Sequence, residues 1–286
     1  MKPGTSLAGE AQNAEQAAHS AASSKSMTML ARLGYAIKGV VYLIIGWLAI
    51  QLAVGHGGSA TDQRGALQAI YEQPFGKVLL VVVAIGLIGF ALWCFIEAIY
   101  DTEGKGKQAK GIIARIGYAV VGISYAALSF GAFSLVLGKS SSGKSSGSQT
   151  QTFTAQLLKL PLGVALVVLV GLIVLGVACY LFGKAYTAKF RNRLNLSSVT
   201  AQLRKGLIAL GRLGYAALGV VFTIIGIFLI VAAFEHNASK AKGLDTALKE
   251  LLQQPFGPIL LGLVALGLLA YGVYSFVEAR YRRVGA

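Results

Sequence analysis

Six long apolar runs dominate the pattern of hydrophobic and polar positions along this chain of 286 residues. Each run is long enough for a helix of about 20 residues, the length that crosses the hydrocarbon core of a bilayer. A soluble helix needs a polar face, whereas residues 78–95 contain no charged side chain. The pattern therefore predicts an all-α membrane protein with six transmembrane helices, near residues 36–54, 75–97, 118–137, 162–183, 215–234 and 257–278.

The six runs are three copies of one two-helix unit. Each copy opens with the phrase Arg-x-Gly-Tyr, whose arginines are Arg32, Arg115 and Arg212. A Pro-[Phe/Leu]-Gly phrase follows in each copy, at Pro74, Pro161 and Pro255. Since every copy has two spans, all copies enter the membrane from the same side, which predicts three parallel repeats. A pseudo-threefold arrangement is the expectation, with a linear row as the alternative.

The predicted organisation has four segments. They are a disordered tail over residues 1–28 and repeats over 29–104, 105–190 and 191–286, the last with a short basic C-terminal tail. Apolar residues at helical spacing in 244–252, and more weakly in 66–70, predict short amphipathic helices in the outer loops. The proline that follows is expected at the first position of the next helix, where no amide donor is needed.

Charge sets the expected orientation. Hydrophobic residues make up 55% of the chain and charged residues 13%, against about 25% charged in a globular domain. The termini and the segments 98–117 and 184–214 carry seventeen of the 26 Lys and Arg, and the other loops carry eight. Because short cytoplasmic loops hold the excess of Lys and Arg, both termini are expected in the cytoplasm. The net charge of +15 then favours contact with anionic lipids at the cytoplasmic face of the bilayer, and no nucleic-acid recognition motif accompanies it.

Small residues recur at fixed offsets in the first helix of each repeat. Because small residues let helix backbones approach closely in lipid, these faces are expected to pack inside the bundle. The predicted packing glycines are Gly34, Gly39, Gly46, Gly117, Gly122, Gly214, Gly219 and Gly226.

A charged residue stands 23 residues after each proline, at Glu97, Lys184 or Glu278. That distance is about 34 Å of helix, so these residues should reach the level of the arginines that open the repeats. The sequence predicts a charged ring at the cytoplasmic face made of Arg32, Glu97, Arg115, Lys184, Arg212 and Glu278. The ring is either a structural clasp of snorkelling and paired groups or a cytoplasmic gate of ion pairs. The neighbouring Trp93, Tyr180 and Tyr274 are expected in an interfacial aromatic belt.

Lys38 is a separate candidate because the repeat does not predict it. Val121 and Leu218 occupy its equivalent positions, and it lies about 9 Å deeper than Arg32. An intramembrane cation of this kind indicates a functional site, although its long stem can also snorkel back to the surface.

The sequence offers little catalytic chemistry. His56 and His236 in outer loops bring too few ligands for a metal. Residues 138–145 match a phosphate-binding loop by letter, but they follow a membrane span and continue as a Gly/Ser linker. We therefore expect a protein that is not an enzyme and has no cofactor or metal.

The three Arg-[Leu/Ile]-Gly-Tyr phrases with their trailing Pro-[Phe/Leu]-Gly phrases resemble the domain of unknown function 1206 family. The resemblance covers residues 31–283 and implies tandem two-helix transmembrane repeats in the plasma membrane of a bacterium. It implies no activity. The second copy departs from the pattern, with Leu162 in place of Phe and Lys184 in place of Glu.

Three functions are compatible with these features. The first is a structural or regulatory membrane protein that binds a protein partner or itself. The second is a transporter or channel for a small solute, ion or proton along the pseudo-threefold axis, lined by Lys38 and the few other polar residues at mid-depth. The third is lipid binding through the outer amphipathic helices. The scarcity of polar residues in the spans favours the first.

Overall fold

The computed structural model of the chain describes residues 25–56, 58–101, 106, 108–138, 146–197 and 199–282. Most of the predicted N-terminal tail, most of the Gly/Ser linker and the last four residues of the C-terminal tail lie outside the described residues.

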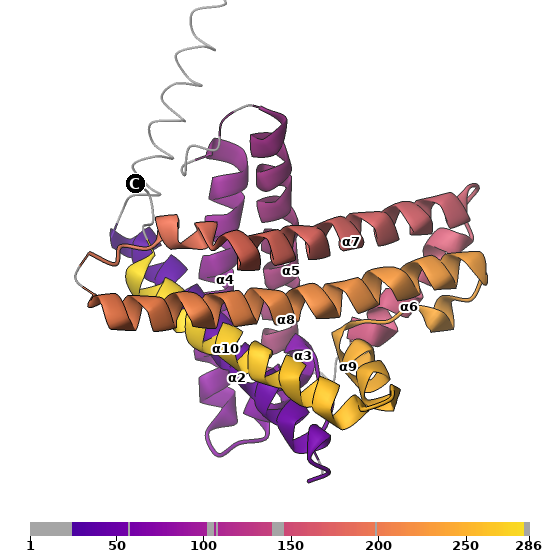
Figure 1. The fold of residues 1–286 in the computed structure, drawn as a ribbon, viewed down its shortest axis with the longest axis horizontal. Coiled ribbons are helices and arrows are strands. Elements are labelled where there is room, and N and C mark those ends of the chain that lie inside the picture. The colour runs from indigo at the N-terminus through magenta and orange to yellow at the C-terminus, as the bar shows by residue number, and fades with distance from the viewer. Residues whose placement is uncertain are drawn as a thin grey trace, which may run out of the picture.

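The described chain is all-α, as predicted (Figure 1). The six long helices are α2 (Lys25–Ala53), α4 (Gly76–Tyr100), α5 (Ala109–Val136), α7 (Gly163–Thr187), α8 (Ala201–Phe234) and α10 (Gly257–Tyr281). All six are long and apolar enough to cross a membrane, which confirms the six predicted spans. The short elements are α3 (Gln63–Tyr71), α6 (Ser146–Leu158), α9 (Leu244–Gln253) and the 3-10 turns η1 (Lys189–Arg193) and η2 (Ala238–Lys240).

One short helix precedes the second long helix of each repeat. The predicted helices at 66–70 and 244–252 are α3 and α9, and each buries its apolar face, through Leu67 and Ile70 or through Leu248 and Leu251. A third such helix, α6, was not predicted because its polar sequence lacks a strong apolar stripe.

The turn before each second helix explains the Pro-[Phe/Leu]-Gly phrase. The helices begin at the glycines Gly76, Gly163 and Gly257, so the prediction that proline occupies the first helical position was wrong. The residue between proline and glycine is the N-cap in the left-handed region, with φ of 63°, 63° and 60° at Phe75, Leu162 and Phe256. The glycine is required because a Cβ there would overlap main-chain atoms of the preceding short helix.

The closest helix pairs join neighbouring repeats. The second helix of each repeat packs along the first helix of the next, in the pairs α4–α5, α7–α8 and α10–α2. The third repeat thus returns to the first, which is the cyclic order expected of pseudo-threefold repeats. The three pairs also share one contact, in which a glycine faces a phenylalanine ring: Gly122 faces Phe95, Gly219 faces Phe182 and Gly39 faces Phe276.

Packing within the repeats is unequal. In the first and third repeats the two helices also pack against each other, as α2–α4 and α8–α10, whereas the described residues of α5 and α7 form no such pair. Gly86 and Gly267 lie at the crossings in the first and third repeats, where a Cβ would overlap Ile37 or Ala217. The second repeat has Ile173 at the equivalent position. The bulk of this residue prevents the same close crossing of α5 and α7.

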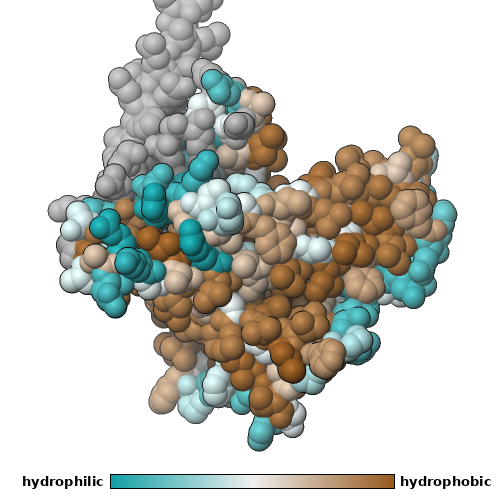
Figure 2. All heavy atoms as spheres, viewed as in Figure 1, coloured by the Kyte–Doolittle hydropathy of each residue, from teal (hydrophilic) through white to brown (hydrophobic). Residues whose placement is uncertain are grey.

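The bundle has one markedly basic end, formed by the start of α2, α5 and α8 and by the end of α4, α7 and α10. In Figure 2 hydrophilic residues gather at the left, where α8 begins, and at the far ends of the helices on the right and at the bottom, with a broad hydrophobic surface between them. In Figure 1 the pair α2–α10 lies diagonally between the pair α4–α5 and the pair α7–α8. Lys38 and Glu278 therefore lie on the central pair.

Candidate functional site

A cluster of buried charged and aromatic side chains occupies the interior of the basic end. We define the charge cluster as Lys38 on α2, Glu278 and Arg282 at the end of α10, and Lys184 on α7, with the aromatic rings around them. Because these residues come from all three repeats, the cluster is the place where the repeats meet.

Lys38 and Glu278 form the centre of the cluster. The Lys38 Nζ lies 3.0 Å from Glu278 Oε2 and donates a second hydrogen bond, of 3.2 Å, to the Tyr271 hydroxyl. The ammonium also lies over the rings of Tyr35 and Tyr271, at 4.8 and 4.9 Å from their centroids. Lys38 is 7% exposed and Glu278 3%, so this ion pair is removed from solvent and hydrogen-bonded on several sides.

Arg282 holds the other oxygen of Glu278. Its Nη1 lies 3.2 Å from Glu278 Oε1, one helical turn along α10. Its guanidinium lies 5.0 Å from the centroid of Tyr35 and 5.2 Å from that of Trp93, and it donates to the Tyr118 hydroxyl at 3.3 Å. Arg282 thus connects α10 to helices of the first and second repeats.

Lys184 is held differently. Its Nζ lies 3.9 Å from the centroid of the Tyr215 ring, and it makes no ion pair with any residue that the structure describes. Glu278 lies within electrostatic range, but Lys38 and Arg282 already bind both of its oxygens. The cluster therefore contains more positive than negative charge around Glu278.

The arginines of the predicted ring lie away from Glu278. Arg115 donates to the main-chain oxygens of Ala98 and Ile99, at 2.7 and 2.6 Å, and Arg212 donates to that of Tyr186 at 3.2 Å. In both cases the arginine caps the carboxyl end of the preceding long helix, where a cation is favourable. Arg32 is exposed, and Glu97 is fully buried. The structure thus brings Lys184 and Glu278 near one another and places Arg115 and Arg212 at the ends of the preceding helices.

Seven of the eight predicted packing glycines lie against a neighbouring helix. Gly34 meets Phe90, Gly214 meets Tyr271, Gly46 meets Leu269 and Gly226 meets Leu175, in addition to the three glycines that face phenylalanine rings. Gly117 is the exception, because nothing lies within 4 Å of the position a Cβ would take.

Sequence reasoning missed the inward role of the aromatic residues and of Arg282. Trp93 and Tyr274, expected in an interfacial belt, are 1% and 0% exposed, because they line the charge cluster. The placement of Arg282 four residues after Glu278 is a signal of an ion pair on one helix face. Tyr271, which accepts from Lys38, had no such signal.

The second repeat has two faces that are buried in the other repeats, and we call them the open faces. On α5, Val120 is 57% exposed, while its equivalents Ile37 and Ala217 are 4% and 7% exposed. On α7, Tyr180 is 62% exposed, while Trp93 and Tyr274 are buried. The open face of α5 consists of Gly117, Val120 and Val121, and that of α7 of Ile173, Val177 and Tyr180.

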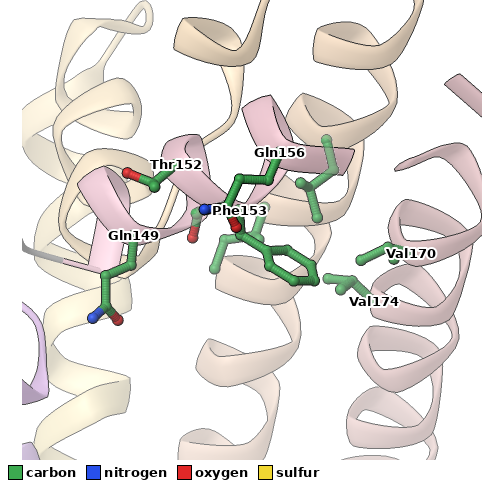
Figure 3. A pocket seen from close by; sticks show the side chains of 9 residues that line it. Gln149, Thr152, Phe153, Gln156, Val170 and Val174 are labelled. Carbon is green, nitrogen blue, oxygen red and sulfur yellow. The ribbon is translucent and has the colours of Figure 1, made fainter. Parts of the chain in front are cut away.

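A groove lies between α6, α7 and α8 (Figure 3). It lies towards the start of α7, whereas Lys184 of the charge cluster is near the end of that helix. It has a volume of about 650 Å³, an apolar wall on α7 and α8, and a rim of amides and hydroxyls on α6. All nine lining residues are neutral: Gln149, Thr150, Thr152, Phe153, Gln156, Val170, Val174, Ile225 and Leu229. Apolar or amphiphilic groups fit such a lining better than ions do.

Comparison with known proteins gives a family without an assigned activity. The model of the Domain of Unknown Function (DUF1206) family matches residues 33–101, 116–188 and 213–282, one match in each repeat. The chain is 36% identical over 253 residues to a protein of Bacillus subtilis (strain 168) described as "Uncharacterized protein YxxB", covering 88% of this chain and 90% of the relative. No solved structure matches. The chain is therefore a three-repeat member of the DUF1206 family.

Proposed function

We propose that this multi-pass membrane protein is a non-enzymatic scaffold in the plasma membrane of a bacterium, with its basic end and both termini in the cytoplasm. The ion pair between Lys38 and Glu278 clasps the first repeat to the third. The clasp fixes a basic cytoplasmic surface that binds a protein partner. The excess of Lys and Arg at this end supports the orientation.

The observation that carries the proposal is that the Lys38 ammonium is buried and fully engaged with protein groups. A cation that lines a passage must meet water or the transported solute. The ammonium of Lys38 instead binds a carboxylate and a hydroxyl between two aromatic rings, and the residue is 7% exposed. This arrangement supports a structural clasp over a gated passage.

The other polar residues at mid-depth favour the same function. Each hydroxyl donates to a main-chain oxygen: Ser124 to Val120, Ser129 to Ala84 and Thr223 to Gly219. Ser129 does so across the α4–α5 pair, where it holds two repeats together. These groups satisfy their hydrogen bonds within the bundle, so they contribute to packing.

The clasp is continuous with the cytoplasmic surface through the linker after α7. Phe190, Leu194 and Leu196 bury the linker against the bundle. The Asn195 amide donates to the Tyr281 main-chain oxygen at 2.7 Å, beside Arg282. The exposed basic side chains that this linker, the start of α8 and the end of α10 present are Lys189, Arg191, Arg204, Lys205 and Arg280. A partner with acidic groups complements this surface.

Affinity capture of the full chain from native bacterial membranes tests the proposal. We expect the wild type to retain a protein partner in a fixed ratio. Lys38→Met leaves the buried Glu278 carboxylate without the Lys38 ammonium, and we expect this variant to lose the protein partner. The triple variant Lys38→Met/Glu278→Leu/Arg282→Met removes the three ion-paired charges together and is expected to keep the partner, because a scaffold needs the shape of the end and not the ion pairs themselves.

Two results would overturn the scaffold. One is the repeated recovery of wild-type chain without a partner. The other is solute or proton flux across proteoliposomes that the triple variant abolishes while its fold stays intact, since this would give the charges a transport role.

A further inference from the structure

The second repeat differs from the other two in both its packing and its charge. Its helices α5 and α7 do not pack together over their described residues, and its open faces carry exposed apolar side chains. Lys184 replaces the glutamate that the other repeats have at the same position, Glu97 and Glu278. The repeat whose two helices do not pack together is thus also the repeat in which the charge at this position is reversed.

Exposure alone does not identify these faces, because any membrane helix exposes apolar side chains to lipid. Positions that face lipid in all three repeats give the reference. They are Val82, Leu169 and Leu263 on the second helices, at 49–62% exposed, and Trp47, Phe130 and Ile227 on the first helices, at 48–75% exposed. Val120 and Tyr180 are as exposed as these positions, yet their equivalents are buried. The open faces are therefore specific to the second repeat.

Another helix of the same kind does not fit the open face of α7. In the first and third repeats a glycine at the crossing, Gly86 or Gly267, lets the partner helix approach. Ile173 occupies this position in α7 and is 58% exposed. A flexible acyl chain can pack along the side of Ile173, whereas the Ile173 side chain keeps a rigid helix at a distance.

Lys184 continues the open face of α7 at the basic end. Residues 173, 177, 180 and 184 are spaced by four, three and four, so they lie on one side of the helix. Lys184 is three residues from the end of α7 at Thr187, about 5 Å along the axis. Lys184 is half-buried: its stem ends the apolar strip near the level of lipid headgroups, and its ammonium lies over the Tyr215 ring at the side of the charge cluster. Arg193 and Arg282 stand beside it and reach across to Tyr118 on α5.

We propose that the open faces of α5 and α7 bind an anionic phospholipid of the leaflet at the basic end. The acyl chains lie along Val120, Val121, Ile173 and Val177, and the phosphate approaches Lys184. Basic sites between transmembrane helices recognise headgroups in this way. Free phosphate lacks chains to cover the apolar faces, so the ligand is a lipid. The inference is independent of the protein partner of the scaffold.

Labelling with photoactivatable lipids tests the position of the bound lipid. The full chain is placed in vesicles of equal parts phosphatidylglycerol and phosphatidylcholine, with a diazirine on the acyl chain of one lipid or the other. We expect the phosphatidylglycerol probe to label residues 173–180 and 117–121 at least about fivefold more than the phosphatidylcholine probe, from about 1 kcal/mol per basic residue. Both probes should label Leu169 and Phe130 equally.

Variants separate a defined site from general surface charge. Lys184→Glu restores the residue type of the other repeats and should remove the preference for phosphatidylglycerol, whereas Lys184→Arg should keep it. Lys205→Glu changes the same charge on an exposed residue at the same end and should also keep it. Equal labelling by the two probes in the wild type, or an equal loss in Lys205→Glu, would overturn the proposal. Photo-crosslinks from the open faces to a second copy of the chain, in place of lipid adducts, would assign the faces to self-association and overturn it as well.

Discussion

The first and second repeats have the same sequence plan but different packing. Gly34 in the first repeat meets Phe90 on its own second helix, whereas Gly117, at the same place in the second repeat, meets nothing within 4 Å. Trp93 is buried and Tyr180, its equivalent, is 62% exposed. The contacts between repeats are nevertheless the same, since Gly122 and Gly219 both face a phenylalanine ring of the preceding helix.

This difference separates two roles of the repeated phrases. The glycine seven residues after each arginine joins neighbouring repeats, and it does so in all three pairs. The glycine of Arg-x-Gly-Tyr closes a repeat on itself, and it does so only where the second helix also has a glycine at the crossing. A repeat can therefore stay in the cyclic order while its own two helices separate.

The largest expected effect concerns the clasp between the first and third repeats. Lys38→Met removes one partner of a buried ion pair and should lower the free energy of unfolding by about 3–5 kcal/mol. The triple variant Lys38→Met/Glu278→Leu/Arg282→Met removes all three ion-paired charges and should come within about 1–2 kcal/mol of the wild type, because none of these buried charges is left without its partner. Unfolding in detergent, followed by tryptophan fluorescence, measures both.

The matched change in the second repeat is Lys184→Met. Because Lys184 makes no ion pair with the described residues, its removal should lower stability much less than Lys38→Met does. Equal losses for the two variants would show that the second repeat depends on its cation as much as the first, and the contrast between the repeats would be lost.

The next effect tests the packing glycines at one position in two repeats. Gly34→Leu forces a side chain against Phe90, where a Cβ alone would lie within 2.9 Å of the ring, and should cost about 1–3 kcal/mol through overpacking. Gly117→Leu meets open space and should stabilise α5 slightly, by up to about 1 kcal/mol, because leucine is the better helix former. Melting temperatures in detergent give the sign of each effect. A comparable loss in both variants would mean that α5 and α7 are in contact after all.

The sequence was sufficient for the features that depend on composition and period. The six spans, the three repeats and the two amphipathic helices α3 and α9 follow from runs of apolar residues and their spacing. The parallel orientation of the repeats follows from the number of spans per copy. Span length, residue spacing and the number of spans can all be read from a single sequence.

The charge cluster was only partly predictable. Lys38 was a candidate because the other repeats have no charged residue at its position. Glu278 was a candidate because all three repeats have a charged residue at its position. Their pairing with each other depends on α10 packing against α2, a contact between residues 240 positions apart. Ile173 stands where the other second helices have a crossing glycine, and this difference is informative only once the contacts of Gly86 and Gly267 are known. Spatial neighbours of this kind are not encoded in spacing along the chain.

A smaller effect tests whether Ile173 keeps the second repeat open. Ile173→Gly gives α7 the residue that the other second helices have at the crossing, so α5 and α7 should approach each other. The measurement is the distance between spin labels at Phe130 and Leu169, which face lipid in every repeat, in a chain without Cys94 and Cys179. The distance should shorten in Ile173→Gly and stay unchanged in the control Leu172→Gly, which shortens an exposed residue one position away. An unchanged distance in both would assign the opening to another cause.

The smallest effect concerns the arginines that cap the long helices. Arg115 donates to two main-chain oxygens at the end of α4, and Arg212 to one at the end of α7. Arg115→Gln should therefore cost about 0.5–1 kcal/mol and Arg212→Gln less, because a cation at a helix carboxyl end contributes an energy of this size. The bond from Arg115 to the Ala98 oxygen is partly buried, whereas Arg212 and its bond to Tyr186 are exposed. The loss for Arg115 should therefore persist at high salt, where the cap of Arg212 is screened. Thermal unfolding at low and high salt compares the two variants. A larger loss of stability for Arg212→Gln would show that the second repeat depends on the cap of α7 more than the first repeat depends on the cap of α4. The different packing of the second repeat would then originate at the helix ends and not at Ile173.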